Sequence, residues 1–148
     1  MLRFKMLETL TPVYRARKQW SDRSKQVDMP LFPGYIFCRF AGAQKARVLD
    51  TPGIGKIVGF GGHPAPVPDD EVGAIQAAMR SGSPLRPWPR LKPGDRVRVE
   101  RGPLRGVDGT FVKEKDAWTF VIGIEMLQRW VAVDLDPATL TPLRALAN

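Results

Sequence analysis

A stiff turn in the first quarter of the chain constrains the fold more than any other segment. The six residues Pro30 to Tyr35 contain two prolines and a glycine, and they lead directly into the apolar run Ile36 to Phe40. Proline fixes φ and removes a backbone donor, so this segment predicts a rigid entrance to a strand. The rings of Phe32 and Tyr35 are then held in place by the turn. Such a pair suits either a small hydrophobic core or a docking surface, and both interpretations stay open at this point.

The composition is that of a globular protein. Of 148 residues, 43% are apolar and 26% are charged. No apolar run approaches the roughly 20 residues of a membrane helix, and the first residues lack the apolar core of a signal peptide, so we expect a cytoplasmic protein. Cys38 is the single cysteine and His63 the single histidine, which excludes an internal disulfide and a Cys/His zinc set. We expect no metal and no other cofactor.

The net charge of +8 is concentrated near the start of the chain. Residues 1–25 contain seven basic and two acidic residues, a net charge of +5. A local basic patch is typical of a surface that binds nucleic-acid phosphates, because each neutralised phosphate releases counterions. A solvated basic face without a ligand is the alternative.

The first half of the chain predicts a hairpin followed by short elements. Residues 11–19 and 26–40 read as strands separated by the polar turn 21–25, which gives a basic hairpin with the stiff turn inside its second strand. A short helix is expected over 43–49 and a short strand over 54–60. A longer helix is expected from Asp69, as N-cap, to Arg80, with Gly82 as C-cap.

The second half predicts a small β-barrel. Three prolines and one glycine in residues 81–90 indicate a linker. Beyond it the pattern changes to five short strands, which would close so that no long edge is exposed: 96–100, 107–113, 118–124, 129–135 and 139–141. The expected core of this barrel consists of Val97, Val99, Val107, Phe111, Phe120, Ile122, Val131 and Val133.

The turn between the first two of these strands is rich in glycine. Glycine permits the positive φ that a tight reversal needs. The turn residues are Gly102, Pro103, Leu104, Gly106 and Gly109. From Leu91 onward the segment resembles a KOW motif, which occurs in SH3-like barrels of ribosomal proteins and of NusG/Spt5 transcription elongation factors.

Motifs in the first half resemble the N-terminal domain of the NusG family, in order and spacing. They are residues 30–37, 51–54, 58–62 and 64–72. The resemblance covers nearly the whole chain. It implies an α+β fold in which an antiparallel sheet with flanking helices precedes a five-stranded SH3-like KOW barrel. The implied domains are 1–82 for the NusG N-terminal-like domain, 83–90 for the linker and 91–148 for the barrel.

The resemblance also implies partners and a function. In this family the N-terminal domain docks on the clamp helices of the largest RNA polymerase subunit and modulates pausing, termination or antitermination. The matching positions here are Phe32, Pro33, Gly34 and Tyr35, with Phe60 nearby. A stiff turn with aromatic anchors suits docking on helices. The alternative is that Phe32 and Phe37 belong to the core and that only Tyr35 reaches the surface.

The equivalent of the basic hairpin faces the upstream or non-template DNA in NusG-like proteins. The residues expected to face DNA are Arg15, Arg17, Lys18, Trp20, Arg23 and Lys25. Arginine and lysine would bind phosphates and Trp20 would stack on a base, although Trp20 would equally well cap the hairpin.

A loop of the KOW domain implies a further contact, with Rho or with the NusE-type ribosomal protein. The matching residues are Met126, Leu127 and Arg129. The family often has Ile-Phe-Gly-Arg in this loop, whereas this chain has Met-Leu-Gln-Arg and loses the aromatic ring and the glycine. This departure argues against Rho and favours an operon-specific paralog. The chain is expected to be a monomer without membrane contact.

The start of the chain departs from the family pattern. Residues 1–10 match only the end of the family's first helix, so the opening strand of the sheet is missing. We expect that the start codon was assigned too late. The alternative is that the chain is a degenerate copy of a family member with a weakened fold.

Two other classes of protein remain as alternatives. An enzyme would need Cys38 and His63 as nucleophile and base, but Cys38 between Phe37 and Arg39 has the setting of a small core residue, and no phosphate-binding loop appears. We therefore expect no enzyme. A KOW-containing ribosomal or rRNA-binding protein is the stronger alternative.

Overall fold

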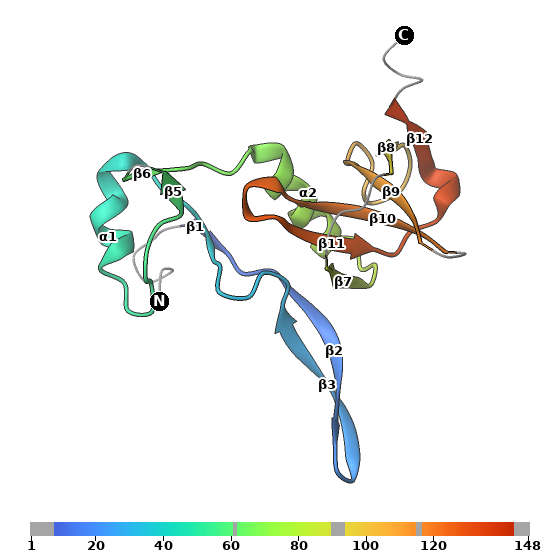
Figure 1. The fold of residues 1–148 in the computed structure, drawn as a ribbon, viewed down its shortest axis with the longest axis horizontal. Helices are drawn as coiled ribbons and strands as arrows, with labels where there is room; N and C mark the ends of the chain where they lie inside the picture. Colours follow the sequence, from blue (N-terminus) through green and yellow to red (C-terminus); the bar gives the residue numbers. More distant parts are fainter. Residues whose placement is uncertain (1–7, 61, 90–93, 115–116, 144–148) are drawn as a thin grey trace. The chain divides into compact units, whose positions relative to one another are not determined.

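A computed structural model describes residues 8–60, 62–89, 94–114 and 117–143, with no side-chain description for 114 and 117. Contacts divide the chain into two compact units, each of two segments (Figure 1). The first unit contains residues 1–11 and 33–66, and the second contains residues 12–32 and 67–148. No helix in the described part of the chain is long and apolar enough to cross a membrane.

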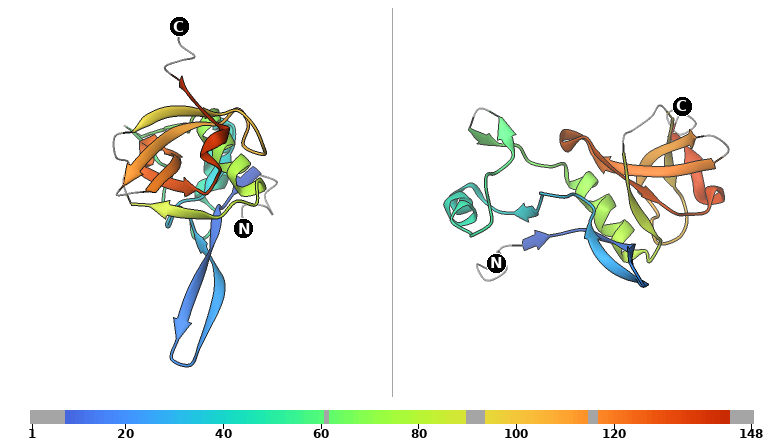
Figure 2. Two further views of the ribbon diagram at one scale, coloured as in Figure 1. Left: turned by 90° about the vertical axis from the view of Figure 1, so that its right-hand side faces the viewer. Right: turned by 60° about the horizontal axis from the view of Figure 1, so that its bottom comes forward.

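The second unit is built on a curved, six-stranded antiparallel sheet (Figure 2). The strand order is β12-β8-β9-β10-β11-β7. The strands are β7 (Leu85–Trp88), β8 (Asp95–Val99), β9 (Asp108–Glu114), β10 (Ala117–Ile124), β11 (Arg129–Val133) and β12 (Leu140–Pro142). The last five correspond to the five strands expected from the sequence, and their ends differ from the expected ends by at most two residues.

The sixth strand, β7, lies in the segment that was interpreted as a linker, so that interpretation is wrong for Leu85–Trp88. Trp88 is opposite Trp130 in the antiparallel pair of β7 and β11, and its side chain is 8% exposed. Pro87 fits because β7 lies at the edge of the sheet, where one side of the strand needs no backbone donor. Burial of a tryptophan therefore holds this proline-rich segment on the sheet. The division into domains at 83–90 stays a prediction.

The sheet is apolar on both faces. Six of the eight expected core residues are buried, whereas Val107 and Phe111 are half-buried. A second cluster, from the alternate positions of the strands, contains Trp88, Val112, Val121 and Ala132, with Trp130 packed against it. This cluster was not predicted, because only one buried face was expected for each strand. Helix α2 (Asp69–Arg80) contacts β10 and buries Ile75 and Ala78.

The ends of α2 agree with the prediction to within one residue. The N-cap is Pro68, so Asp69 is the first helical residue and not the cap. Asp69, Asp70 and Glu71 lie in the first turn, where the helix dipole favours negative charge. At the other end Ser81 is the C-cap, and Gly82 has a φ of +77°, which a glycine adopts at little cost.

The basic hairpin is also part of the second unit. Strand β2 (Val13–Trp20) pairs with β3 (Arg23–Pro30) through eight residue pairs, and Ser21 and Asp22 form the turn. The backbone N–H of Leu31 donates to the carbonyl of Pro12 at 3.0 Å and closes the base of the hairpin. The second strand thus ends at Pro30 and not at Phe40 as expected, because the stiff turn interrupts it.

The described residues of the first unit form two separate strand pairs. Strand β1 (Glu8–Leu10) pairs with β4 (Phe37–Arg39), and β5 (Gly59–Phe60) pairs with β6 (His63–Pro64). Between them lie the 3-10 helix η2 (Gly42–Gln44) and helix α1 (Lys45–Leu49). A small cluster around buried Val48 holds these elements together through Cys38, Phe40, Ile54 and Ile57.

The single N-terminal antiparallel sheet expected from the family resemblance is not formed by the described residues. The pairs β1–β4, β2–β3 and β5–β6 are separate two-stranded sheets. Glu8–Leu10 form a strand where the end of a helix was expected, and the strand expected over 54–60 is reduced to Gly59–Phe60. The architecture is mixed α/β, with few helices and one six-stranded antiparallel sheet.

Candidate protein-docking and nucleic-acid-binding surfaces

The stiff turn separates buried residues from accessible ones. Leu31 and Phe32 are 2% and 1% exposed and belong to the second unit. Pro33 and Gly34, in the first unit, are exposed, and Gly34 has a φ of +85°. Tyr35 is half-buried. The expectation that the Phe32 ring anchors a partner does not fit this burial, which agrees with the alternative that Phe32 belongs to a core.

Among the described residues of the first unit, three large apolar side chains are exposed, and we consider them a candidate docking surface. Ile36, Leu49 and Phe60 have exposed fractions of 48%, 40% and 76%. Sequence reasoning named Phe60 but missed Ile36 and Leu49. The alternation along Tyr35 to Phe37 could have indicated Ile36, because neighbouring side chains of an extended segment point in opposite directions.

A hollow adjoins this candidate surface. Its volume is about 210 Å³, and it is lined by residues of α1, β5 and β6 together with Ile57 and Gly62. Leu49 forms part of its wall. The ammonium of Lys45 donates to the carbonyl of Gly62 at 3.2 Å and ties α1 to the turn before β6. Gly59 has no room for a Cβ, because the His63 carbonyl occupies that position. The strand pair that presents Phe60 is therefore tightly closed.

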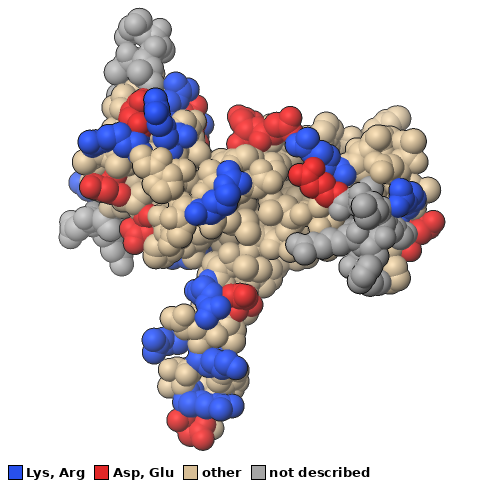
Figure 3. Space-filling model, turned by 180° about the vertical axis from the view of Figure 1, so that it is seen from behind, with Lys and Arg blue, Asp and Glu red and all other residues tan. Residues whose placement is uncertain are grey.

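The hairpin β2–β3 carries most of the basic residues near the start of the chain, and Figure 3 shows Lys and Arg side chains along its length. Directly opposite residues of an antiparallel pair share a face of the sheet. One face therefore carries Arg15 and Arg17. Arg15 forms an ion pair with Asp28 at 3.2 Å, and Arg17 donates to the Ser24 hydroxyl at 3.3 Å.

The other face of the hairpin has a different character. Near the base its side chains are half-buried, as at Tyr14 and Met29. Toward the turn Lys18 lies opposite Lys25, and Trp20 lies opposite Arg23, whose guanidinium carbon is 5.9 Å from the centroid of the Trp20 ring. Trp20 is 46% exposed. Two lysines directly opposite each other repel, and no described carboxylate pairs with them. We call Lys18, Trp20, Arg23 and Lys25 the tip face.

The glycine-rich turn has the backbone that its sequence predicts. Gly102 and Gly106 both have a φ of +88°. Leu104 between them is 3% exposed, which anchors the turn in the core, whereas Pro103 is exposed. The N–H of Gly106 donates to the carbonyl of Val99 at 2.8 Å. The third glycine, Gly109, is in β9, and the Phe120 ring lies where a Cβ would be.

The loop that matches the family's partner loop forms the 3-10 helix η3 (Glu125–Leu127). Met126 and Leu127 are half-buried and Arg129 is exposed. Arg129 donates to the carbonyls of Leu127 and Gln128 at 3.3 and 3.2 Å. Gln128 has a φ of +52°, the left-handed conformation that favours glycine. The glycine of the family pattern therefore fits the backbone of this loop, and this chain adopts the same conformation with a glutamine.

Helix α2 touches this loop. The carboxylate Oε2 of Glu71 accepts from the backbone N–H of Glu125 at 3.2 Å, whereas its Oε1 is buried without a hydrogen-bond partner. Burial raises the pKa of Glu71, and the charges of Asp70 and Glu125 add to the increase, while the hydrogen bond from Glu125 opposes it. The contact stabilises the loop and leaves a carboxylate in an unfavourable setting.

Cys38 and His63, the two residues considered for catalysis, lie in different settings. Burial raises the pKa of the Cys38 thiol, so less thiolate is present at neutral pH than in a free cysteine. Cys38 packs in the cluster around Val48, while His63 is exposed in β6. Within the described ranges no group of three or more His, Cys, Asp or Glu residues could hold a metal ion.

Comparison with known proteins identifies the class to which this chain belongs. The family model described as "Transcription termination factor nusG" matches residues 1–76, more than half of the chain. The chain therefore belongs to the NusG family.

Curated relatives match over most of their length. The "Transcription termination/antitermination protein NusG" of Escherichia coli (strain K12) is 28% identical over 135 residues, which cover 87% of this chain and 74% of the relative. The protein of the same name from Halalkalibacterium halodurans is 28% identical over 140 residues, 89% of this chain and 78% of the relative. The protein of the same name from Buchnera aphidicola is 26% identical over 136 residues, which cover 87% of this chain and 74% of the relative.

Proposed function

We propose that this chain is a transcription elongation and antitermination factor that docks on the clamp helices of RNA polymerase and modulates pausing or termination. The observation that carries the proposal is the exposure of Ile36 and Phe60, next in sequence to a rigid turn and a closed strand pair, in a member of the NusG family. Apolar side chains held on stiff backbone lose little entropy when a helix covers them, which makes them good anchors.

The residues proposed for docking are Pro33, Gly34, Tyr35 and Ile36, with Phe60. Tyr35 is half-buried, so its ring is held in place while part of it remains available to a partner. Phe32 is left out of this set because it is buried. Leu49 and the hollow beside it extend the apolar surface.

We further propose that the hairpin β2–β3 contacts the upstream or non-template DNA through its tip face. Lys18, Lys25 and Arg23 would neutralise phosphates, and Trp20 would stack on an unpaired base. The unfavourable Lys18–Lys25 pair supports this role, because a ligand's phosphates would remove the repulsion.

The residues Met126, Leu127 and Arg129 are proposed to contact a NusE-type ribosomal protein in preference to Rho. Met126 and Leu127 are half-buried, so only a small apolar surface is available to a partner. Arg129, held by its hydrogen bonds to the loop backbone, adds one positive charge to it. Such a contact fits a weak, regulated interaction better than a large interface.

Affinity capture tests the proposed function. The tagged chain is expected to recover RNA polymerase from a bacterial lysate treated with nuclease, which removes indirect bridging through nucleic acid. Recovery of ribosomal subunits or rRNA in an untreated lysate, without polymerase in either, would instead indicate the ribosomal alternative. A matched chain with Phe60→Ala is expected to recover less polymerase, because the exposed ring is lost without disturbing a core.

A further inference from the structure

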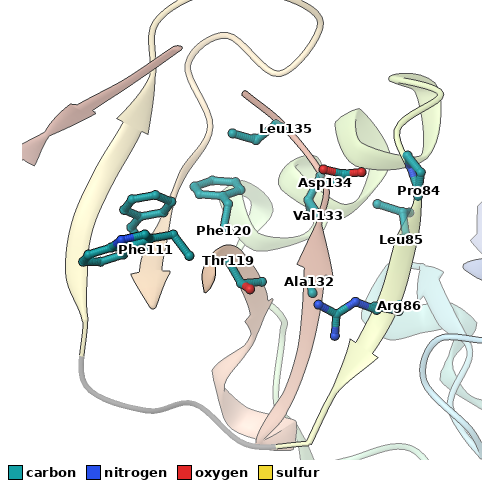
Figure 4. Close-up of a pocket in the computed structure, with 11 residues that line it drawn as sticks. Pro84, Leu85, Arg86, Phe111, Thr119, Phe120, Ala132, Val133, Asp134 and Leu135 are labelled. Atoms are coloured by element: carbon teal, nitrogen blue, oxygen red, sulfur yellow. The ribbon is translucent and has the colours of Figure 1, made fainter. Parts of the chain in front are cut away.

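A second hollow, on the six-stranded sheet, adjoins an aromatic surface that is already covered. Its volume is about 320 Å³, and Phe111 and Phe120 form part of its wall (Figure 4). The ring of Trp118 stacks on Phe111 with 4.7 Å between the centroids, and the ammonium of Lys113 is 5.7 Å from the Trp118 centroid. By contrast, the hairpin β2–β3 has one face whose polar side chains are exposed along its whole length.

The register of β2 with β3 determines which side chains share this exposed face. Arg15 lies opposite Asp28, Arg17 lies opposite Gln26, and Gln19 lies opposite Ser24. Directly opposite residues point to the same side of the ribbon. All six are exposed, whereas the half-buried residues of the hairpin lie on the side of the tip face: Tyr14, Ala16, Val27 and Met29. We call the six exposed residues the polar face: Arg15, Arg17, Gln19, Ser24, Gln26 and Asp28.

The two guanidinium groups of the polar face are oriented and still have donors to offer. Nη1 of Arg15 donates to Asp28 at 3.2 Å, and Nη1 of Arg17 donates to the Ser24 hydroxyl at 3.3 Å. A guanidinium has five N–H donors, so these contacts use only part of each group. The side chains of the Arg15–Asp28 pair are 65% and 55% exposed, and an ion pair in such a setting adds little stability. Each arginine is therefore able to make further hydrogen bonds to a ligand.

The side chains of the polar face match the edges of base pairs in the DNA major groove. This groove admits a two-stranded β-ribbon, in which arginine pairs with O6 and N7 of guanine and glutamine pairs with N6 and N7 of adenine. Side chains two residues apart on a strand are about 6.8 Å apart, which is twice the base-pair spacing of about 3.4 Å. Arg15, Arg17 and Gln19 would therefore meet base pairs that are two steps apart.

We propose that the hairpin lies in the major groove of duplex DNA and reads base edges through the polar face, chiefly through Arg17 and Gln19. The preferred site then contains a guanine and an adenine two base pairs apart. The long side chains of Lys18 and Lys25 would reach the phosphates at the rims of the groove. Phosphate contacts position the hairpin on any sequence, and base contacts supply the preference.

This inference rests on the proposed DNA contact of the hairpin and adds sequence recognition to it. The two claims involve different residues, because the tip face was proposed to bind phosphates and an unpaired base. Loss of the lysines should lower the affinity for every sequence by a similar factor, whereas loss of base contacts should remove only the preference. One binding assay therefore distinguishes the failure of one claim from the failure of the other.

Selection from a pool of short DNA duplexes with a randomised centre tests the inference. The full chain is incubated with the pool at low salt, and the bound duplexes are sequenced. We expect enrichment of sites with guanine and adenine two base pairs apart. In fluorescence anisotropy the chain should bind the enriched duplex roughly 5- to 150-fold more tightly than a duplex of the same composition in shuffled order, the range typical of one good base contact.

Variants of the hairpin separate base reading from general charge. Arg17→Lys keeps the positive charge but loses the planar fork, so it should bind the shuffled duplex as the wild type does and lose the preference for guanine. Gln19→Ala should lose the preference for adenine. Lys18→Ala with Lys25→Ala is the matched control, and it should weaken binding of both duplexes by the same factor. Circular dichroism checks that each variant is folded.

Three results would overturn the inference. The first is a pool without an enriched sequence while binding still depends on Lys18 and Lys25, because the hairpin then contacts phosphates alone. The second is a preference that Arg17→Lys and Gln19→Ala leave intact in folded chains. The third is an equal preference for the same sequences as single strands, which would exclude reading in the major groove. Absence of DNA binding at low salt would contradict the proposed DNA contact as well.

Discussion

At the scale of single residues, the missing side chain at Gly109 allows the core of the sheet to close. A Cβ at this position would lie 2.6 Å from two ring carbons of Phe120 and 2.8 Å from the carbonyl oxygen of Val121. Neither neighbour can move easily, because Phe120 is 1% exposed and the carbonyl belongs to β10. The glycine at this position is therefore required by packing and not by a turn.

We predict that Gly109→Ala lowers the free energy of unfolding by about 1–3 kcal/mol, the usual cost of overpacking a core. The chain offers a matched control in Gly73, which lies inside α2 with open space where a Cβ would be. Gly73→Ala is expected to raise stability by about 0.5–1 kcal/mol, because alanine is the better helix former. Denaturant unfolding of both variants measures the two effects. A stable Gly109→Ala variant would show that the Phe120 ring has room to move.

At the scale of elements, the hairpin has two faces whose basic residues have different surroundings. Arg15 and Arg17 already have partners in Asp28 and Ser24, whereas Lys18 and Lys25 face each other. The sequence analysis treated all the basic residues of the hairpin as one group. Only the register of β2 with β3 separates them, because it decides which residues lie opposite each other.

We predict that Lys18→Ala with Lys25→Ala weakens binding of fork DNA more than Arg15→Ala with Arg17→Ala does. The slope of the logarithm of affinity against the logarithm of salt concentration should fall by about 1 for each lysine that binds a phosphate. Replacing both lysines should also raise the thermal stability of the hairpin, because the repulsion between the two ammonium groups is relieved. Titrations at several salt concentrations measure the slopes. Equal slopes for the two double variants would contradict the division into faces.

The contact of α2 with η3 makes stability depend on pH. The pKa of Glu71 is raised in the folded state, so the folded chain binds this proton more tightly than the unfolded chain does. Protonated Glu71 therefore stabilises the fold below the ordinary glutamate pKa of about 4.3. This stabilisation is lost as the pH rises through the pKa of Glu71 in the folded state.

We predict that Glu71→Gln removes this part of the pH dependence. The difference in free energy of unfolding between the variant and the wild type should move in favour of the variant as the pH rises from about 4 toward neutrality. Glu100→Gln, at an exposed glutamate of the second unit, is the control. Denaturant unfolding at a series of pH values provides the measurement. A difference that stays constant with pH would show that Glu71 is not destabilised by its burial.

Local signals predicted some elements well and others poorly. Helix α2 was predicted to within one residue because its acidic first turn, apolar stripe and Gly82 all lie within the segment itself. The strands β8 to β11 were found because their alternation is local as well. Strand β7 was missed because its three neighbouring prolines indicate a linker, and only the pairing with β11 and the burial of Trp88 show otherwise. The pairing of β1 with β4 likewise depends on residues almost thirty positions apart.

The candidate sites were predicted in part. The hairpin and its basic residues lie where the sequence indicated, and Phe60 is exposed. For Phe32 the sequence left two interpretations open, an anchor beside Tyr35 or a core residue, because both rings occupy the same stiff turn and differ only in what packs against them; Phe32 is buried and Tyr35 is half-buried. The aromatic stack of Phe111 with Trp118 was missed, since Phe111 was assigned to the core and Trp118 to a strand without a role.

At the scale of the whole molecule, the two units are proposed to bind different partners. The first unit, with Tyr35, Ile36 and Phe60, is proposed to bind polymerase, and the second unit is proposed to bind nucleic acid through the hairpin. The net charge of +8 supports association with a nucleic-acid assembly in general, but it does not distinguish these surfaces. Substitutions in one unit should therefore change one kind of binding and leave the other nearly unchanged.

The affinity of purified RNA polymerase for the chain with Tyr35→Ala tests whether the turn around Tyr35 docks on the polymerase. The chain has two tyrosines, and Tyr14→Ala, at the half-buried base of the hairpin, is the matched control. We predict at least a 5-fold loss of affinity for Tyr35→Ala, as expected when an aromatic anchor worth more than about 1 kcal/mol is removed, and little change for Tyr14→Ala. Equal affinities of the Tyr35→Ala chain and the wild type would contradict docking through this turn.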